Sequence, residues 1–226
     1  MTNRESDLGA RAIVARPALR ENWRFAAWRF VLAGFGAVAL AGCASVSNTL
    51  SPQEVAGLKL TGVAVTFTPE AAVQWEDGQR LYAASKGVSY PQIGQPVDAA
   101  EEKAYLRNAL TPKLKAAMEK NLAATLHGSR PVRLEVTVRN FDISPPLQRA
   151  VLGGGYSMLG DVNLVDARTG AVIIAYPNLS AFLYAGNGVL GATVQAIVDA
   201  NGQAPADRVV DEFASKYGKW LAQQST

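Results

Sequence analysis

Residues 132–141 read VRLEVTVRNF, and their side chains alternate between apolar and polar. A period of two is typical of a β-strand with one buried face and one solvated face. The apolar positions are Val132, Leu134, Val136 and Val138. The polar positions between them are Arg133, Glu135, Thr137 and Arg139. The stretch therefore predicts a sheet with an apolar face that other elements must cover.

Three further stretches carry strand signals. Residues 58–67 (LKLTGVAVTF) alternate, with a change of register at Gly62 that predicts a β-bulge. Residues 157–167 and 171–176 flank a short turn that contains Gly170. This arrangement predicts a hairpin with the glycine at positive φ.

Two stretches have the period of a helix. In residues 98–127, large apolar side chains recur every four residues. They are Leu106, Leu110, Leu114, Met118 and Leu122. Pro112 interrupts this row, so the pattern predicts either one kinked helix or two abutting helices, the second capped by Thr111. Residues 206–221 predict a final amphipathic helix.

These elements together predict an α+β fold. We expect a mainly antiparallel sheet of about four strands, with a long kinked helix and a C-terminal helix packed on one face. Between the first strand and the long helix, residues 69–97 hold several glycines and prolines. They predict an irregular connection, in which a short helix around 70–81 is an alternative.

The net charge of +3 is carried by one end of the chain. Residues 1–42 contain six arginines and three acidic residues. Residues 43–226 then hold 22 − 6 = 16 basic and 19 − 3 = 16 acidic residues, a balance of zero. We therefore expect no nucleic-acid partner, because the body of the protein has no bulk attraction for polyanions.

The N-terminal segment has the features of a secretory signal. An uncharged apolar run over 30–40 follows Arg29 and is too short to span a bilayer as a helix. It ends in LAGC, and Cys43 is the only cysteine of the chain. One cysteine excludes an intrachain disulfide, and the alternative role for it is that of a buried core thiol.

The motif Leu40-Ala41-Gly42-Cys43 resembles the lipobox of bacterial lipoproteins. The resemblance implies that Cys43 is acylated, that the chain is cut between Gly42 and Cys43, and that the lipid bilayer is its first partner. Ala44, where aspartate would imply retention at the inner membrane, implies a place in the outer membrane, facing the periplasm. We therefore expect a signal peptide over 1–42, a lipidated flexible tether over 43–57, and one α+β periplasmic domain over 58–226.

Two uncharged regions stand out in the second half of the chain. No charged residue lies between Arg168 and Asp199, and residues 150–160 hold three consecutive glycines. The ordinary interpretation is a buried strand over 179–184, a turn over 186–188 and a buried helix over 189–198. The functional interpretation is a surface for another subunit or for the bilayer. Its candidate residues are Gly153, Gly154, Gly155, Tyr156, Phe182, Tyr184, Asn187 and Val189.

No catalytic or metal-binding motif is recognisable. His127, the only histidine, is expected at the end of the long helix as a solvated residue. Asp161 and Asp166 are five apart on a strand and hence on opposite faces, and Asp142 is expected in a turn. We therefore expect no catalytic residues, no metal and no cofactor, and we expect that the protein is not an enzyme.

From about residue 106 to residue 221 the chain resembles periplasmic lipoprotein domains of unknown function in Gram-negative bacteria. The resemblance rests on RPVRLEVTVRNF, a glycine-rich loop, GDVNLVDARTGAVI and a C-terminal helix. The hairpin LVDARTGAVI is also similar to the domain of the curli-secretion channel lipoprotein. These likenesses imply an α/β or α+β domain with an assembly or accessory role in the cell envelope. They transfer no catalytic residue.

Three functional hypotheses follow. In the first, the protein is a non-enzymatic, membrane-anchored lipoprotein that binds a protein partner or itself in the envelope. In the second, it is a subunit of an oligomeric, channel-like lipoprotein in which residues 147–200 contact or enter the outer membrane. The third is an envelope hydrolase.

Overall fold

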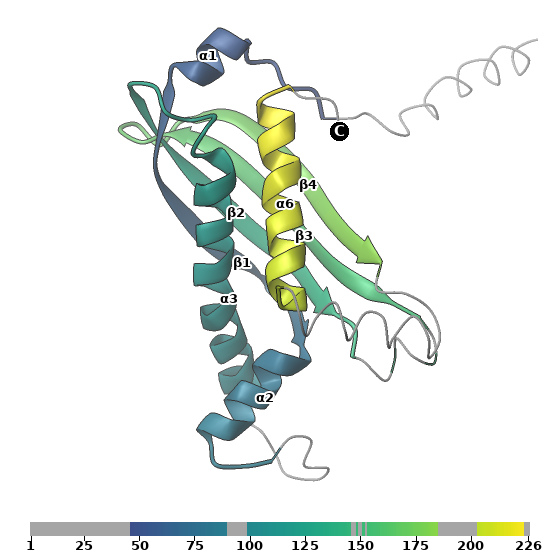
Figure 1. Cartoon of the computed structure of the whole chain (residues 1–226). Helices are drawn as coiled ribbons and strands as arrows, with labels where there is room; N and C mark the ends of the chain where they lie inside the picture. The colour runs from purple at the N-terminus through teal and green to yellow at the C-terminus, as the bar shows by residue number, and fades with distance from the viewer. Residues whose placement is uncertain are drawn as a thin grey trace, which may run out of the picture. The chain divides into compact units, whose positions relative to one another are not determined.

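The strand predicted over 132–141 lies inside a four-stranded sheet in the computed structural model (Figure 1). Strand β2 (Arg130–Ile143) pairs in parallel with β1 (Leu58–Trp75) and antiparallel with β3 (Gly155–Asp166). Strand β4 (Val172–Tyr184) pairs antiparallel with β3, so that β1 and β4 are the edges. The structure describes residues 46–89, 99–145, 148, 151, 153–184 and 203–223.

Two long helices cover one face of the sheet (Figure 1). They are α3 (Ala99–Leu122) and α6 (Pro205–Leu221). The short helices α1 (Pro52–Ala56) and α2 (Glu76–Ser85) precede and follow β1. The predicted fold class, an α+β domain with a mainly antiparallel sheet and helices on one face, is confirmed.

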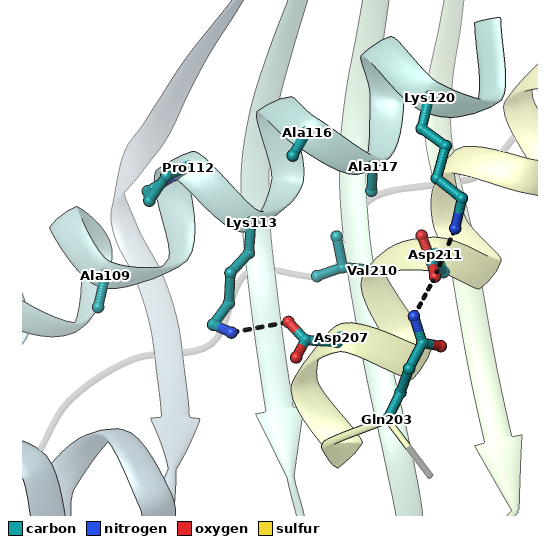
Figure 2. Close-up of a pocket in the computed structure, with 10 residues that line it drawn as sticks. All are labelled: Ala109, Pro112, Lys113, Ala116, Ala117, Lys120, Gln203, Asp207, Val210 and Asp211. Carbon is teal, nitrogen blue, oxygen red and sulfur yellow. Dashed lines mark hydrogen bonds and ion pairs between the residues drawn. The ribbon is translucent and has the colours of Figure 1, made fainter.

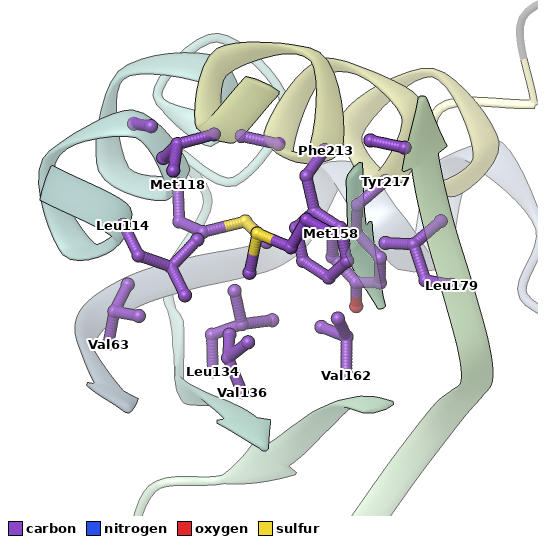
Figure 3. Packing of buried hydrophobic residues seen from close by; sticks show 14 of the residues in the cluster. Val63, Leu114, Met118, Leu134, Val136, Met158, Val162, Leu179, Phe213 and Tyr217 are labelled. Atoms are coloured by element: carbon purple, nitrogen blue, oxygen red, sulfur yellow. The ribbon is translucent and has the colours of Figure 1, made fainter. Parts of the chain in front are cut away.

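The core lies between the apolar face of the sheet and the inner faces of α3 and α6. The predicted apolar rows of α3 and β2 are fully buried in it. Figure 3 shows Phe213 and Tyr217 of α6 packed among Met158 and Val162 of β3 and Leu179 of β4. Each large apolar side chain buried in this way contributes about 1.5–3 kcal/mol to stability. This packing fixes α6 over β3 and β4.

Three buried polar atoms in the described part of the chain have no hydrogen-bond partner. They are Trp75 Nε1, Arg107 Nε and the Tyr217 hydroxyl. Burial raises the pKa of Tyr217, because the core does not solvate a phenolate. Tyr217 therefore remains a neutral ring that fills space in the core.

Strand β1 is longer than predicted, and residues 69–85 are not an irregular connection, because β1 runs to Trp75 and helix α2 follows directly. The alternative of a short helix around 70–81 is confirmed for residues 76–81 only. The bulge at Gly62 is confirmed, but β1 continues to Trp75 through a second irregularity between Phe67 and Ala72. Cations of α3 bind the carbonyl groups exposed there. Arg107 Nη2 donates to the oxygens of Thr68, Pro69 and Ala71 at 3.0, 3.3 and 3.2 Å, and Lys103 Nζ donates to that of Pro69 at 2.9 Å. These hydrogen bonds satisfy backbone carbonyl groups of β1 that do not bond to β2 at the irregularity.

Helix α3 is one continuous helix with Pro112 inside it, so the alternative of two helices is wrong. Thr111 does not cap a second helix, since its Oγ1 donates to the carbonyl oxygen of Arg107 at 2.8 Å, one turn back. Pro112 lacks the N–H that would bind the carbonyl of Asn108. Both residues lie on the exposed side of the helix, where water can solvate that carbonyl.

The prediction of a flexible tether is wrong for residues 46–57. Trp220 Nε1 donates to the carbonyl oxygen of Val46 at 2.6 Å. Asn48 Nδ2 donates to the last carbonyls of α6, at 3.2 Å to Trp220 and 2.8 Å to Leu221. Leu50 packs against the core. We call residues 46–50 the N-terminal latch, because they fasten the chain to the end of α6.

Strand β4 extends beyond the predicted 171–176 to Tyr184. Asn178, with φ of 55°, interrupts its regular course. The ordinary interpretation of 179–184 as a strand is confirmed, but only alternate residues are buried, namely Leu179 and Ala181. The turn predicted over 186–188 and the helix over 189–198 lie outside the described residues.

The hairpin between β3 and β4 is held by Asp166. Its Oδ1 accepts the backbone N–H groups of Arg168 and Thr169, both at 3.1 Å, and its Oδ2 accepts Nη2 of Arg130 at 3.0 Å. The Arg130 guanidinium and these N–H groups lower the pKa of the Asp166 carboxyl to about 2. Gly170, with φ of +73°, completes the turn as predicted.

Substituting Gly170 with alanine should lower the free energy of unfolding by about 1–2 kcal/mol, because a Cβ strains a residue with positive φ. No atom lies within 4 Å of the added Cβ, so the loss would report backbone strain alone. Gly62→Ala is the matched control, since it has the same open space without a positive φ. Urea unfolding of both variants measures the difference, and equal stabilities would contradict the turn geometry.

Stability should fall as the pH drops from about 4 towards 2, because the folded state holds the Asp166 pKa below its ordinary value of 3.8. The ionised, paired carboxylate stabilises the fold above this window and is protonated below it. Carbon-detected NMR titration should show the Asp166 pKa rising towards 3.8 in Arg130→Ala. Arg168→Ala, which keeps its backbone N–H, should leave that pKa in place; a rise there equal to that in Arg130→Ala would refute the assignment.

Candidate functional site

An exposed aromatic surface lies at the end of β4. Phe182 and Tyr184 are 63% and 58% exposed. Alternation along β4 turns them away from the buried Ala181, onto the face of the sheet that carries no helix. Gly155 of β3 is the register partner of Tyr184. We call Gly155, Phe182 and Tyr184 the β4 aromatic surface.

Gly155 allows the ring of Phe182 to lie against the backbone of β3. A Cβ at this position would meet the carbonyl oxygen of Leu183 at 2.4 Å and the Phe182 ring at 2.9 Å. Gly153, with φ of +78°, turns the chain into β3 just before it. Gly155 thus has a structural purpose, which is to admit an aromatic ring beside β3.

The structure unites some of the predicted surface residues and separates others. Gly155, Phe182 and Tyr184 lie on adjacent strands, and Gly153 and Gly154 lead into them. Tyr156 does not belong to the surface, because its side chain points into the core and is fully buried. Gly42, Cys43, Asn187 and Val189 lie outside the described residues.

Asp142 adjoins the β4 aromatic surface, and the prediction that places it in a turn is wrong. It lies within β2, opposite Ser157, which in turn lies opposite Phe182. Burial raises the pKa of its carboxyl. An acidic group two strands away from the exposed aromatic rings gives this part of the sheet face both apolar area and a hydrogen-bonding group, a combination found at protein interfaces.

Polar residues occupy much of the rest of the helix-free face, and two ion pairs lie on it. Arg133 pairs with Glu135, and Arg139 contacts Asp161 at 3.4 Å. Such exposed pairs contribute little to stability and keep the face solvated. The aromatic surface is therefore an apolar corner on a polar face.

A groove between α3 and α6, of about 580 Å³, is the second candidate site (Figure 2). Alanines of α3 line it together with two ion pairs, Lys113–Asp207 at 2.7 Å and Lys120–Asp211 at 3.4 Å. Gln203 also donates to Asp211, at 2.8 Å. Each carboxylate is bound to a cation from the opposite helix, so the two ion pairs join α3 to α6. The groove is therefore better described as a helix–helix contact than as an acid–base site.

Sequence reasoning missed this groove. Lys113 and Asp207 lie 94 residues apart, and only the packing of α3 on α6 joins them. The available signal was the spacing of Asp207 and Asp211, one turn apart on a single helix face.

Metal-binding and membrane-spanning features are absent from the described part of the chain. Within it, no group of three or more histidine, cysteine, aspartate or glutamate side chains could hold a metal ion. None of its helices is both long and apolar enough to cross a bilayer. His127 is exposed in the connection after α3 and not at the end of that helix, where it was expected.

Fold and site together define an α+β domain with an apolar corner on an otherwise polar sheet face. Residues 109–226, just over half of the chain, match the model of a family of unknown function, DUF6778. The protein belongs to this family. Among curated proteins, none matches the sequence.

Three solved structures similar to the chain come from bacteria. A protein from Caulobacter crescentus described as a lipoprotein is 22% identical over 50% of this chain and 80% of its own, with a TM-score of 0.28. A protein of family DUF330 from Xanthomonas campestris is 12% identical over 80% and 92%, with a TM-score of 0.38. The PelC dodecamer from Paraburkholderia phytofirmans is 12% identical over 80% and 96%, with a TM-score of 0.32.

Substituting Gly155 with alanine should lower the free energy of unfolding by about 1–3 kcal/mol, because the new methyl group would displace β4 or the Phe182 ring. Ser157→Ala, on the same face of the same strand, is the control and should change it by less than about 0.5 kcal/mol. Chemical denaturation measures both. A neutral Gly155→Ala would show that Phe182 does not rest on this glycine.

Proposed function

We propose that this protein is a lipid-anchored component of the outer membrane that faces the periplasm and binds another protein without catalysing a reaction. The observation that carries the proposal is the β4 aromatic surface. Large aromatic side chains exposed together at a strand end are costly to leave in water and are typical of the centres of protein interfaces. The lipobox ending at Cys43 supports the location.

The paired charges support binding over catalysis. In the groove between α3 and α6, both aspartates are bound to lysines of the facing helix. A general acid or base needs a proton-transfer atom that can reach a substrate, and ion pairing with two lysines opposes that role. Near the aromatic surface, Asp142 has Ser157 as its cross-strand neighbour on β3, and Ser157 in turn lies opposite Phe182, so a carboxylate and an aromatic ring share one row across the sheet.

The second candidate function is a subunit of a channel-like oligomer in which residues 147–200 contact or enter the outer membrane. One observation favours it. Val151, Phe182 and Tyr184 all fall within that span and are exposed, Val151 at 72%. The two functions differ in what covers the aromatic surface, which is a protein in the first and lipid in the second.

A photo-crosslinking amino acid at position 182 should give a discrete protein adduct in intact cells. The same amino acid at Leu81, an apolar side chain of α2 that is 57% exposed, is the matched control and should give much less of that adduct. Crosslinking to lipid at position 182, with no protein adduct, would overturn the first function and favour the second.

Cys43→Ser should release the protein from membranes without unfolding it, because the lipid attaches through the cysteine sulfur. Cell fractionation measures the release. The double variant Phe182→Ser/Tyr184→Ser should lose the protein adduct but keep its attachment to the membrane. Because position 182 is replaced in this variant, the photo-crosslinking amino acid is placed at a neighbouring exposed position such as Ser180. If Cys43→Ser stayed membrane-bound as an oligomer, the binding role proposed here would be wrong.

A further inference from the structure

The N-terminal latch fixes where the chain enters the folded domain. Val46 is bound by the indole N–H of Trp220 at 2.6 Å, and Asn48 binds the carbonyls of Trp220 and Leu221. The Trp220 ring itself packs on Tyr176 and Tyr217, with ring centroids 4.7 and 5.5 Å away. The entry point is therefore held by the core and cannot swing freely.

Cys43 lies three residues before Val46. Even a fully extended chain spans at most about 3.6 Å per residue, so Cys43 lies within about 11 Å of the latch whatever its conformation. Taking from the proposed function that Cys43 carries the lipid, we propose that the end of the sheet beside α1 rests on the bilayer. We call it the anchor end; it comprises α1, the β3–β4 turn and the C-terminal end of α6.

Hydrogen bonds across this end show that its parts belong together. The backbone N–H of Arg130 donates to Gly57, directly after α1, at 3.0 Å. The N–H of Ala167, in the β3–β4 turn, donates to Pro131 at 3.1 Å. In Figure 1, α1, this turn and the last turn of α6 lie at the same end of the sheet, opposite α2.

The charges of the anchor end suit a lipid surface. Two exposed cations, Arg168 and Lys219, belong to this end, and two more, Lys59 and Arg130, lie at the starts of β1 and β2 beside it. Two carboxylates oppose them, Glu54, whose pKa is lowered by hydrogen bonds from Ser51, and Asp166, which pairs with Arg130, so these six groups carry a net charge of 4 − 2 = +2. Outward-facing cations are attracted to anionic headgroups within a Debye length of the membrane.

The β4 aromatic surface lies at the other end. Trp220, which binds the latch, contacts Tyr176, and Tyr184 follows Tyr176 by eight positions along β4. At about 3.3 Å per residue this is about 26 Å along the strand. The short link to Cys43 therefore directs Phe182 and Tyr184 into the periplasm, away from the membrane that holds the lipid. A partner at this surface is a periplasmic protein or the periplasmic part of one.

Energy transfer to the membrane surface tests the orientation. The acylated full-length protein is reconstituted into vesicles of phosphatidylethanolamine and phosphatidylglycerol that carry an acceptor dye on the headgroups. A donor dye is attached to a single introduced cysteine, because acylation leaves Cys43 without a free thiol. Ala171→Cys labels the exposed β3–β4 turn, and Leu81→Cys and Phe182→Cys label the far end.

Transfer from position 171 should exceed that from 81 and from 182 by about twofold or more, because residues 171 and 182 are eleven residues apart, about 36 Å along β4, and α2 lies at the end of the sheet opposite α1. A twelve-residue Gly/Ser insertion between Ser45 and Val46 should remove most of the difference, because it loosens the short link. Equal transfer from all three sites without the insertion, or higher transfer from 182, would overturn the orientation alone. If the unlabelled protein failed to float with the vesicles, both the anchor and the orientation would be wrong.

Discussion

Burial of the apolar face of β2 is the constraint on which the rest of the structure depends. The valines and the leucine of this face form the sheet side of the core and have no exposed surface. Only this face of the strand must be covered by other elements, because the residues that alternate with it are charged or polar. Helices α3 and α6 cover it, and everything on the other face, including the β4 aromatic surface, is left to water or to a partner. The same alternation that builds the core therefore also exposes Phe182 and Tyr184.

Polar groups at the edges of the sheet are satisfied by cations from these helices. Arg107 and Lys103 bind the carbonyls of the β1 irregularity, and Lys216 of α6 donates to the carbonyl of Ser180 on β4 at 2.7 Å. Lysine and arginine at edge strands also discourage pairing with other chains. This favours contact through the sheet face over strand addition as the way in which the protein meets a partner.

The latch links the fold to the location that the lipobox implies. A freely moving tether would leave every face of the domain equally able to meet the membrane. A chain held by Trp220 and Asn48, three residues from Cys43, favours one end. In the proposed orientation, the domain would act as a spacer whose aromatic surface projects into the periplasm. Binding and anchoring occupy opposite ends, so a lipid and a protein partner can be held together.

The sequence alone determined the features that local patterning can encode. The strand over 132–141, the leucine row of α3, the glycine turn at 170 and the fold class all follow from the burial of alternate residues or of every fourth residue, which a single element records in its own sequence. Tertiary structure alone decided the length of β1, the attachment of the latch, the paired charges between α3 and α6, and the removal of Tyr156 from the surface. Each of these depends on residues far apart in the chain, such as Asn48 and Leu221 at a separation of 173. Neither member of such a pair shows a local pattern of its own, because the contact exists only once the sheet and both helices have packed.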